Sequence, residues 1–310
     1  MQNIVLQLLM AQRQFEHPSA EELPLKHISD YAPFYEVDAH WQPDATADDD
    51  DNKSKDSKTP RLIDKIETAH AALGYRVYNT HLRWEMLPPT SDDDDDDDDF
   101  PSVKYIYVVR DGRDVLTSFY HHLSNQHPDD GGFQGTFPEF LEQFLQGTIA
   151  YGKWSHHLAS WMPVIESGNH SSNLPVLLVR YEDLKADLQG QIVRIGQFLG
   201  LSSFRGNDPK LQQDKVVLNR VSLDRVSFDH MRKHQELYHP ISVRWKPGYH
   251  FIRSGTVGDY KSFFTEEQRR RFMDTVEADF RELAAAKKGD DDDGPAIPSW
   301  LYKVGIVDKN

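Results

Sequence analysis

The chain contains no cysteine, which excludes a disulfide framework and any metal site with cysteine ligands. It also has no apolar run approaching the roughly 20 residues that a membrane-spanning helix needs. Its N-terminus lacks the basic and apolar regions of a secretory signal. These absences fit a reducing compartment, so we expect a cytoplasmic protein with no membrane partner.

Positive charge is also scarce, since the formal net charge of the 310 residues is −15. The acidity is local, because sixteen aspartates lie in three runs, Asp48–Asp51, Asp92–Asp99 and Asp290–Asp293, and the rest of the chain carries +1. A nearly neutral chain without a basic stripe gives no reason to expect a nucleic-acid partner. Function must therefore be sought in local sites.

The aspartate runs cannot pack, because like charges at that density repel one another. We expect a domain at residues 1–283 with disordered insertions near 44–59 and 91–99, followed by a linker and tail at 284–310. A calcium site is the weaker alternative, since such sites interleave carboxylates with glycine and carbonyl ligands.

Apolar residues at helical spacing predict a helix over residues 1–15 and a second over 62–73, which Gly74 ends. Arg76, Val77 and Tyr78 then suggest a short strand that leads into Asn79, Thr80 and His81. The segment from Trp245 to Thr265 mixes glycine, aromatic and basic residues without a period. It could be a loop that covers a ligand or an ordinary surface loop.

Two segments repeat the order of strand, turn and helix. The first has a buried strand at 104–109, a turn at 110–113 and a helix that Asp114 can cap. The second has a strand at 174–179, a turn at 180–185 and an apolar-faced helix that Gly200 ends. This repetition predicts an α/β fold with helices packed on a parallel sheet.

Ligands of parallel sheets bind beyond the carboxyl ends of the strands, where three polar groups are expected. The Arg110 guanidinium and the Ser118 hydroxyl near a helix start could clamp an anion. Alternatively, Arg110 pairs with Asp111 or Asp114 at the surface. Arg180 to Asp183 follows the second strand, and His81 is the candidate general base.

The histidine pairs His121-His122 and His156-His157 do not make a convincing metal site. Adjacent residues on a helix point in different directions, so the two rings of a pair cannot hold one ion together. We therefore expect no metal.

Four segments together resemble the cytosolic sulfotransferase family. YIYVVRDGRDVLTSFYHH, LLVRYEDLKADL, VSFDHMRKH and IRSGTVGDYKSFFT follow one another in the family's order, within roughly the first 272 residues. The resemblance implies a P-loop-like parallel α/β sheet with helices on both faces. It also implies PAPS (3′-phosphoadenosine 5′-phosphosulfate) as the sulfate donor and a small-molecule acceptor. The acceptor itself cannot be named from the sequence.

The resemblance assigns roles to individual residues. Arg110 and Ser118 would hold the 3′-phosphate, and Tyr181, Ser227 and Phe228 would lie near the adenine. Further phosphate contacts would come from the family's RKG segment, which reads Arg253, Ser254, Gly255 here. THL in YNTHLRWEMLP matches the family's KTHLP, so His81 would be the catalytic base.

The sequence departs from the family at four places. A phosphosulfate loop of the PKSGTTW type is not present before MQNIVLQLL, so we expect an N-terminally truncated sulfotransferase fold. Asn79 and Ser254 each replace a lysine. The dimer pattern KxxxTVxxxE is only half matched, by Lys261 and Thr265, which leaves the oligomeric state open.

Three functions remain in competition. The first is PAPS-dependent sulfation of a hydroxyl or amine of a small acceptor. The second is a catalytically deficient relative that binds or regulates. A nucleotide kinase comes last, because the phosphate-binding pattern GxxxxGK(S/T) is missing.

Overall fold

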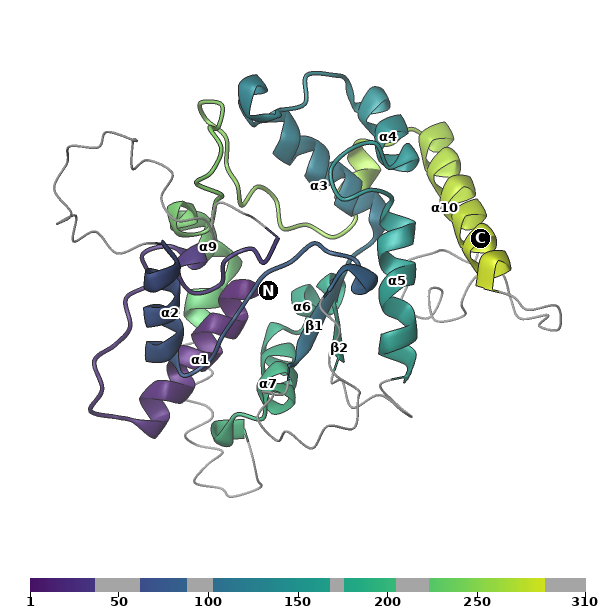
Figure 1. Ribbon diagram of the computed structural model, residues 1–310. Helices are drawn as coiled ribbons and strands as arrows, with labels where there is room; N and C mark the ends of the chain where they lie inside the picture. Colours follow the sequence, from purple (N-terminus) through teal and green to yellow (C-terminus); the bar gives the residue numbers. More distant parts are fainter. Residues whose placement is uncertain (37–61, 88–102, 168–175, 205–222, 288–310) are drawn as a thin grey trace, which may run out of the picture. The chain divides into compact units, whose positions relative to one another are not determined.

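The computed structural model describes residues 1–36, 62–87, 103–167, 176–204 and 223–287 (Figure 1). The three aspartate runs lie outside the described residues, so the expected insertions and most of the expected tail stay predictions. The chain forms two compact units. The first unit comprises Met1–His81, Gln189–Pro240 and His250–Arg253, and the second comprises Leu82–Leu188, Ile241–Tyr249 and Ser254–Asn310.

The first unit is helical in its described part. Its core includes the predicted N-terminal helix, whose Leu6, Leu8 and Leu9 are at most 2% exposed. The second predicted helix is also confirmed, and Gly74 ends it in the left-handed conformation, at φ 78°. The elements are α1 (Gln2–Glu16), η1 (Ile28–Asp30), α2 (Leu62–Leu73), most of α7 (Leu188–Leu199), η5 (Ser202–Phe204), α9 (Phe228–Lys233) and η6 (Gln235–Leu237).

The strand expected at residues 76–78 is wrong. Only Asn79 is paired there, in a single parallel bridge with Phe34. The Asn79 N–H donates to the Pro33 carbonyl at 2.9 Å, and the Tyr35 N–H donates to the Asn79 carbonyl at 2.8 Å. Pro33 contributes no N–H of its own, so this segment does not extend the pairing into a ladder.

The second unit holds the predicted parallel sheet, in which β1 (Tyr105–Val109) pairs with β2 (Val176–Arg180). Tyr105 lies opposite Val176 and Val109 lies opposite Arg180, so both strands end at the same edge. Around this sheet, the described elements are η3 (Trp84–Met86), α3 (Gly112–Ser124), η4 (Pro128–Asp130), α4 (Phe137–Gln146), α5 (Trp154–Ser167), α6 (Tyr181–Ala186), η7 (Asp259–Ser262) and α10 (Glu266–Lys287) (Figure 1).

An aromatic and aliphatic core holds the second unit together. Val109 of β1 and Leu116 of α3 are at most 3% exposed, as are Phe140 of α4 and Phe272 of α10. α5 packs against β2 and α10, and its Trp161 stacks on Tyr107 of β1 with ring centroids 4.9 Å apart. The core therefore fixes β1 and the start of α3 on a rigid base.

Two turns expected after the strands are helical instead. α3 begins at Gly112 because Asp111, rather than Asp114, caps it: the Asp111 carboxylate accepts from the Arg113 N–H at 2.9 Å. α6 begins directly after β2 and occupies the expected turn at 180–185. α10 continues to Lys287, so the first four residues of the expected tail are helical.

None of the helices in the described ranges is long and apolar enough to cross a membrane.

Candidate functional site

The carboxyl end of β1 places Arg110 beside the start of α3. Its Nη2 donates to the Thr256 carbonyl at 2.9 Å and lies 3.3 Å from Oδ2 of Asp114. Both contacts use Nη2, and neither Nε nor Nη1 donates to a described residue; Nε is buried as well. Arg110 thus retains unused donors of the kind that bind phosphate.

Asp114 ties the 254–260 segment to α3. Its carboxylate is fully buried and accepts from the Gly258 N–H at 2.8 Å and from the Tyr260 N–H at 3.0 Å. The alternative interpretation, a surface pair between Arg110 and Asp114, is therefore wrong about the location. The pair exists, but its carboxylate is in the interior and shared with two backbone donors.

Arg113 links Asp111, at the start of α3, to Tyr260 of the 254–260 segment. Its guanidinium donates to Asp111 at 2.6 Å and lies over the Tyr260 ring, 4.2 Å from the centroid. Because the side chain is only 7% exposed, this arginine is structural and does not compete with Arg110 for a ligand.

Ser118 lies one helical turn beyond Asp114, on the same side of α3. It is exposed, and its hydroxyl bonds to none of the residues that the structure describes. The segment next to Arg110 also contains two other predicted site residues. Gly255 adopts a left-handed φ of 63°, and Ser254 donates its hydroxyl to Oγ1 of Thr256 at 2.6 Å.

Tyr181, the first residue of α6, packs its ring against the Arg110 guanidinium. The Cζ atom of Arg110 lies 4.3 Å from the centroid of the ring. Burial raises the pKa of the Tyr181 hydroxyl, while the charge of Arg110 acts in the opposite direction. The ring is therefore a neutral support that orients the guanidinium and contributes a cation–π contact.

In the second unit the structure thus brings Arg110 together with Tyr181 and the segment that holds Ser254 and Gly255. A guanidinium with unused donors, an exposed hydroxyl on α3 and a glycine-containing turn favour an anion. The donor set fits a phosphate monoester, because a guanidinium N–H and a hydroxyl can both donate to its charged oxygens.

His81, in the first unit, lies in a separate arrangement that Glu36 creates. One Glu36 carboxylate oxygen accepts from the His81 backbone N–H at 2.8 Å and lies 3.0 Å from the ring Nδ1. The Phe34 ring stacks on the imidazole, with centroids 5.0 Å apart and planes 19° apart. Two neighbours therefore fix the orientation of the ring.

Glu36 is ionised at neutral pH. Burial raises the pKa of its carboxyl, but the hydrogen bonds from the His81 ring and backbone outweigh burial and lower the pKa below its ordinary value of 4.5. A carboxylate can only accept, so Nδ1 of the neutral ring must carry the hydrogen. The lone pair of His81 then lies on Nε2, which is the atom that a general base would use.

Glu36 is the functional candidate that the sequence does not reveal. It stands 45 residues before His81, and no local pattern connects a glutamate after an aromatic pair to a histidine that far along the chain. Only the bridge between Phe34 and Asn79, which brings the two segments side by side, could have indicated it.

The remaining predicted residues belong to the first unit. Ser227 caps α9, accepting from the His230 N–H at 3.2 Å, and Phe228 is the first residue of that helix. Arg253 also falls in this unit, whereas Arg110 and Ser118 fall in the second. The convergence of Arg253 with Arg110 around one phosphate stays a prediction.

The described geometry defines an α/β protein with a candidate anion site at the carboxyl ends of two parallel strands. Residues 2–286 match the family described as the sulfotransferase domain. The chain is 31% identical over 217 residues to sulfotransferase 1A1 of Rattus norvegicus, covering 69% of this chain and 66% of that protein. It is 34% identical over 202 residues to sulfotransferase 1A1 of Bos taurus, covering 64% and 59%.

A crystal structure of retinol dehydratase in complex with androsterone and the inactive cofactor PAP has a similar fold. It is 20% identical, with a TM-score of 0.57, and the similarity covers 95% of this chain and 80% of that one. The chain belongs to the sulfotransferase family. The matched region spans 66% or less of these two curated relatives.

Replacing Asp114 by Ala should destabilise the protein by about 3–5 kcal/mol, because Arg110 loses its buried partner and two backbone N–H groups lose their acceptor. Urea unfolding measures this loss. Asp129→Ala, which removes a carboxylate that is 70% exposed, should stay within about 0.5 kcal/mol of wild type. Equal stability of the two variants would contradict the role of Asp114.

Replacing Glu36 by Gln should lower stability at pH 7 but not in acid. A carboxyl whose folded-state pKa is lowered stabilises the fold fully above about pH 4.5 and loses that contribution as pH falls through the folded-state value. Urea unfolding at a series of pH values should therefore show a gap between wild type and variant that closes in acid. The exposed Glu67→Gln should show no such gap, and a pH-independent gap for Glu36→Gln would refute the assignment.

Proposed function

We propose that this chain is a PAPS-dependent sulfotransferase, which transfers a sulfuryl group to a hydroxyl or amine of a small acceptor. The observation that carries the proposal is the Arg110 corner, where an arginine with unused donors follows β1 and contacts both Tyr181 and the 254–260 segment. Family membership and the names of the curated relatives support the reaction class.

The nucleotide would be held chiefly through its 3′-phosphate. Arg110 and Ser118 would donate to the phosphate oxygens, and Ser254 and Gly255 border the same position. Gly255 supports this, because it has no side chain to obstruct a ligand and readily adopts the left-handed φ of 63° found here. Arg253 would add a second charge. Tyr181, Ser227 and Phe228 would lie on the adenine side.

His81 would act as the general base. PAPS supplies the sulfuryl group when bound, and the chain supplies position and proton transfer. Nε2 would take the proton of the acceptor's hydroxyl or amine, and the Glu36 carboxylate would stabilise the imidazolium that forms, as it is already bonded to Nδ1. A positioned base of this kind contributes about 10²–10⁴-fold to the rate.

A catalytically deficient, nucleotide-binding relative is the second candidate, and the residue at position 254 favours it. Serine is uncharged, so Ser254 does not supply the positive charge that the family's lysine would bring there, and its hydroxyl bonds within its own segment, to Thr256. Asn79 likewise brings no charge. Nucleotide binding without sulfuryl transfer would identify this alternative.

Replacing Arg110 by Ala should weaken binding of adenosine 3′,5′-bisphosphate about 10- to 100-fold, because hydrogen bonds to a charged group contribute about 1.5–3 kcal/mol. Isothermal titration with the full chain measures the affinity. Arg271→Ala removes an arginine that is 54% exposed and pairs with Glu142, and it should bind the nucleotide like wild type. Unchanged affinity in Arg110→Ala would remove the phosphate assignment.

Replacing His81 by Ala should leave nucleotide affinity within about threefold of wild type and lower kcat for a panel of phenols, alcohols and amines about 10²–10⁴-fold. Release of the bisphosphate product measures the rate. The exposed His17→Ala should keep the wild-type rate. If His81→Ala turns over as fast as wild type, His81 is not the base.

A further inference from the structure

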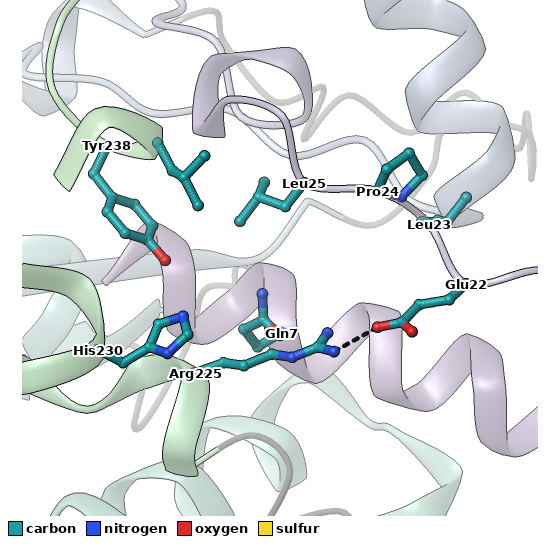
Figure 2. Close-up of a pocket in the computed structure, with 9 residues that line it drawn as sticks. Gln7, Glu22, Leu23, Pro24, Leu25, Arg225, His230 and Tyr238 are labelled. Carbon is teal, nitrogen blue, oxygen red and sulfur yellow. Dashed lines mark hydrogen bonds and ion pairs between the residues drawn. The ribbon is translucent and has the colours of Figure 1, made fainter. Parts of the chain in front are cut away.

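A cavity of about 370 Å³ lies beside α1 in the first unit, and none of the residues assigned above to nucleotide binding or proton transfer lines it. Its walls come from α1, from the 22–25 segment and from residues 225–238 (Figure 2). The volume lies within the range of about 300–1,000 Å³ that is usual for small-molecule sites.

Gln7 is the unusual residue of this cavity. It is 4% exposed, and its carboxamide makes no hydrogen bond to any residue in the described part of the chain. Figure 2 shows its side chain reaching from α1 into the space between Leu25 and Arg225. The carboxamide has one acceptor oxygen and an NH₂ with two donors, so a ligand in the cavity could complete its hydrogen bonds.

The other buried amides of α1 each make at least one hydrogen bond, although Oδ1 of Asn3 is buried without a partner. Asn3 donates to the Arg225 carbonyl at 3.0 Å, and Gln12 donates to the Ser202 hydroxyl at 2.6 Å and accepts from the Ser203 hydroxyl at 2.7 Å. Gln7 lies on the same helix between these two residues. Its carboxamide therefore lacks a hydrogen-bond partner among the described residues.

The cavity carries no net charge. At its rim Arg225 and Glu22 form an ion pair at 2.5 Å, so the two charges neutralise each other. Burial lowers the pKa of His230, and the neighbouring His234 and Arg225 lower it further, so this ring is neutral near pH 7. Leu23, Leu25 and Leu237 supply apolar walls.

We propose that this cavity binds a small uncharged molecule with a flat apolar body and an amide-like edge. One donor and one acceptor on that edge would pair with the Gln7 carboxamide, while the body packs on the leucines. Primary carboxamides and lactams have this chemistry. The residues assigned to the transferase function do not line this cavity, although His230 of its wall donates its backbone N–H to Ser227.

Benzamide tests the proposal as a probe in ligand-observed NMR titrations of the full chain. We expect saturable binding that Gln7→Leu weakens at least tenfold. Gln14→Leu is the matched control, because Gln14 lies on the same helix but is exposed and bonded to the Pro18 carbonyl. It should bind benzamide like wild type.

Two further measurements keep the proposal falsifiable. Leu25→Trp, which fills the cavity from the opposite wall, should abolish binding, and benzoate should bind at least tenfold more weakly than benzamide. No saturable binding, equal binding to Gln7→Leu, or equal binding of benzoate would overturn the proposal. Displacement of benzamide by adenosine 3′,5′-bisphosphate would also overturn it, since the cavity would then belong to the nucleotide site.

Discussion

The buried carboxylate of Asp114 is the interaction on which the second unit's site depends. It holds two backbone N–H groups of the 258–260 turn and the guanidinium of Arg110 at once. A buried charge is tolerated only when its oxygens are satisfied, and here the two backbone partners lie 144 and 146 residues away along the chain. The carboxylate thereby joins the end of β1, the start of α3 and the glycine-containing segment into one corner.

The packing beneath this corner gives it a fixed position. β1 is held by its parallel pairing with β2 and by the stacking of Tyr107 on Trp161. Gly112 allows α3 to begin closely against α10 and α5, because a Cβ there would lie 2.8 Å from the Phe272 ring. A phosphate-binding arginine needs such a base, since a loosely held guanidinium would lose conformational entropy on binding.

Much of the secondary structure could be predicted from periodicity and glycine placement. α1, α2, β1, β2 and α7 appear where apolar spacing puts them, because these patterns reflect burial on one face. The helix cap could not be chosen from the sequence, since Asp111 and Asp114 are both acidic and three residues apart. Asp114 faces the interior because its carboxylate accepts from the Gly258 and Tyr260 N–H groups, which are distant in the sequence.

The candidate site was predictable to a similar extent. Family motifs indicate Arg110, Tyr181, Ser254 and Gly255, and the second unit places these residues around one corner. Glu36 was not predictable, because its contact with His81 depends on a single bridge between two irregular segments. The burial of Gln7 could not be predicted either, because a glutamine within an apolar helical pattern is expected to face solvent.

The most direct test of the account is a crystal structure of the chain with adenosine 3′,5′-bisphosphate. The account predicts the 3′-phosphate within hydrogen-bonding distance, about 2.7–3.2 Å, of the Arg110 guanidinium and of the Ser118 hydroxyl, with Arg253 on the same phosphate. A nucleotide bound elsewhere, or with Arg110 and Arg253 directed to different places, would contradict it.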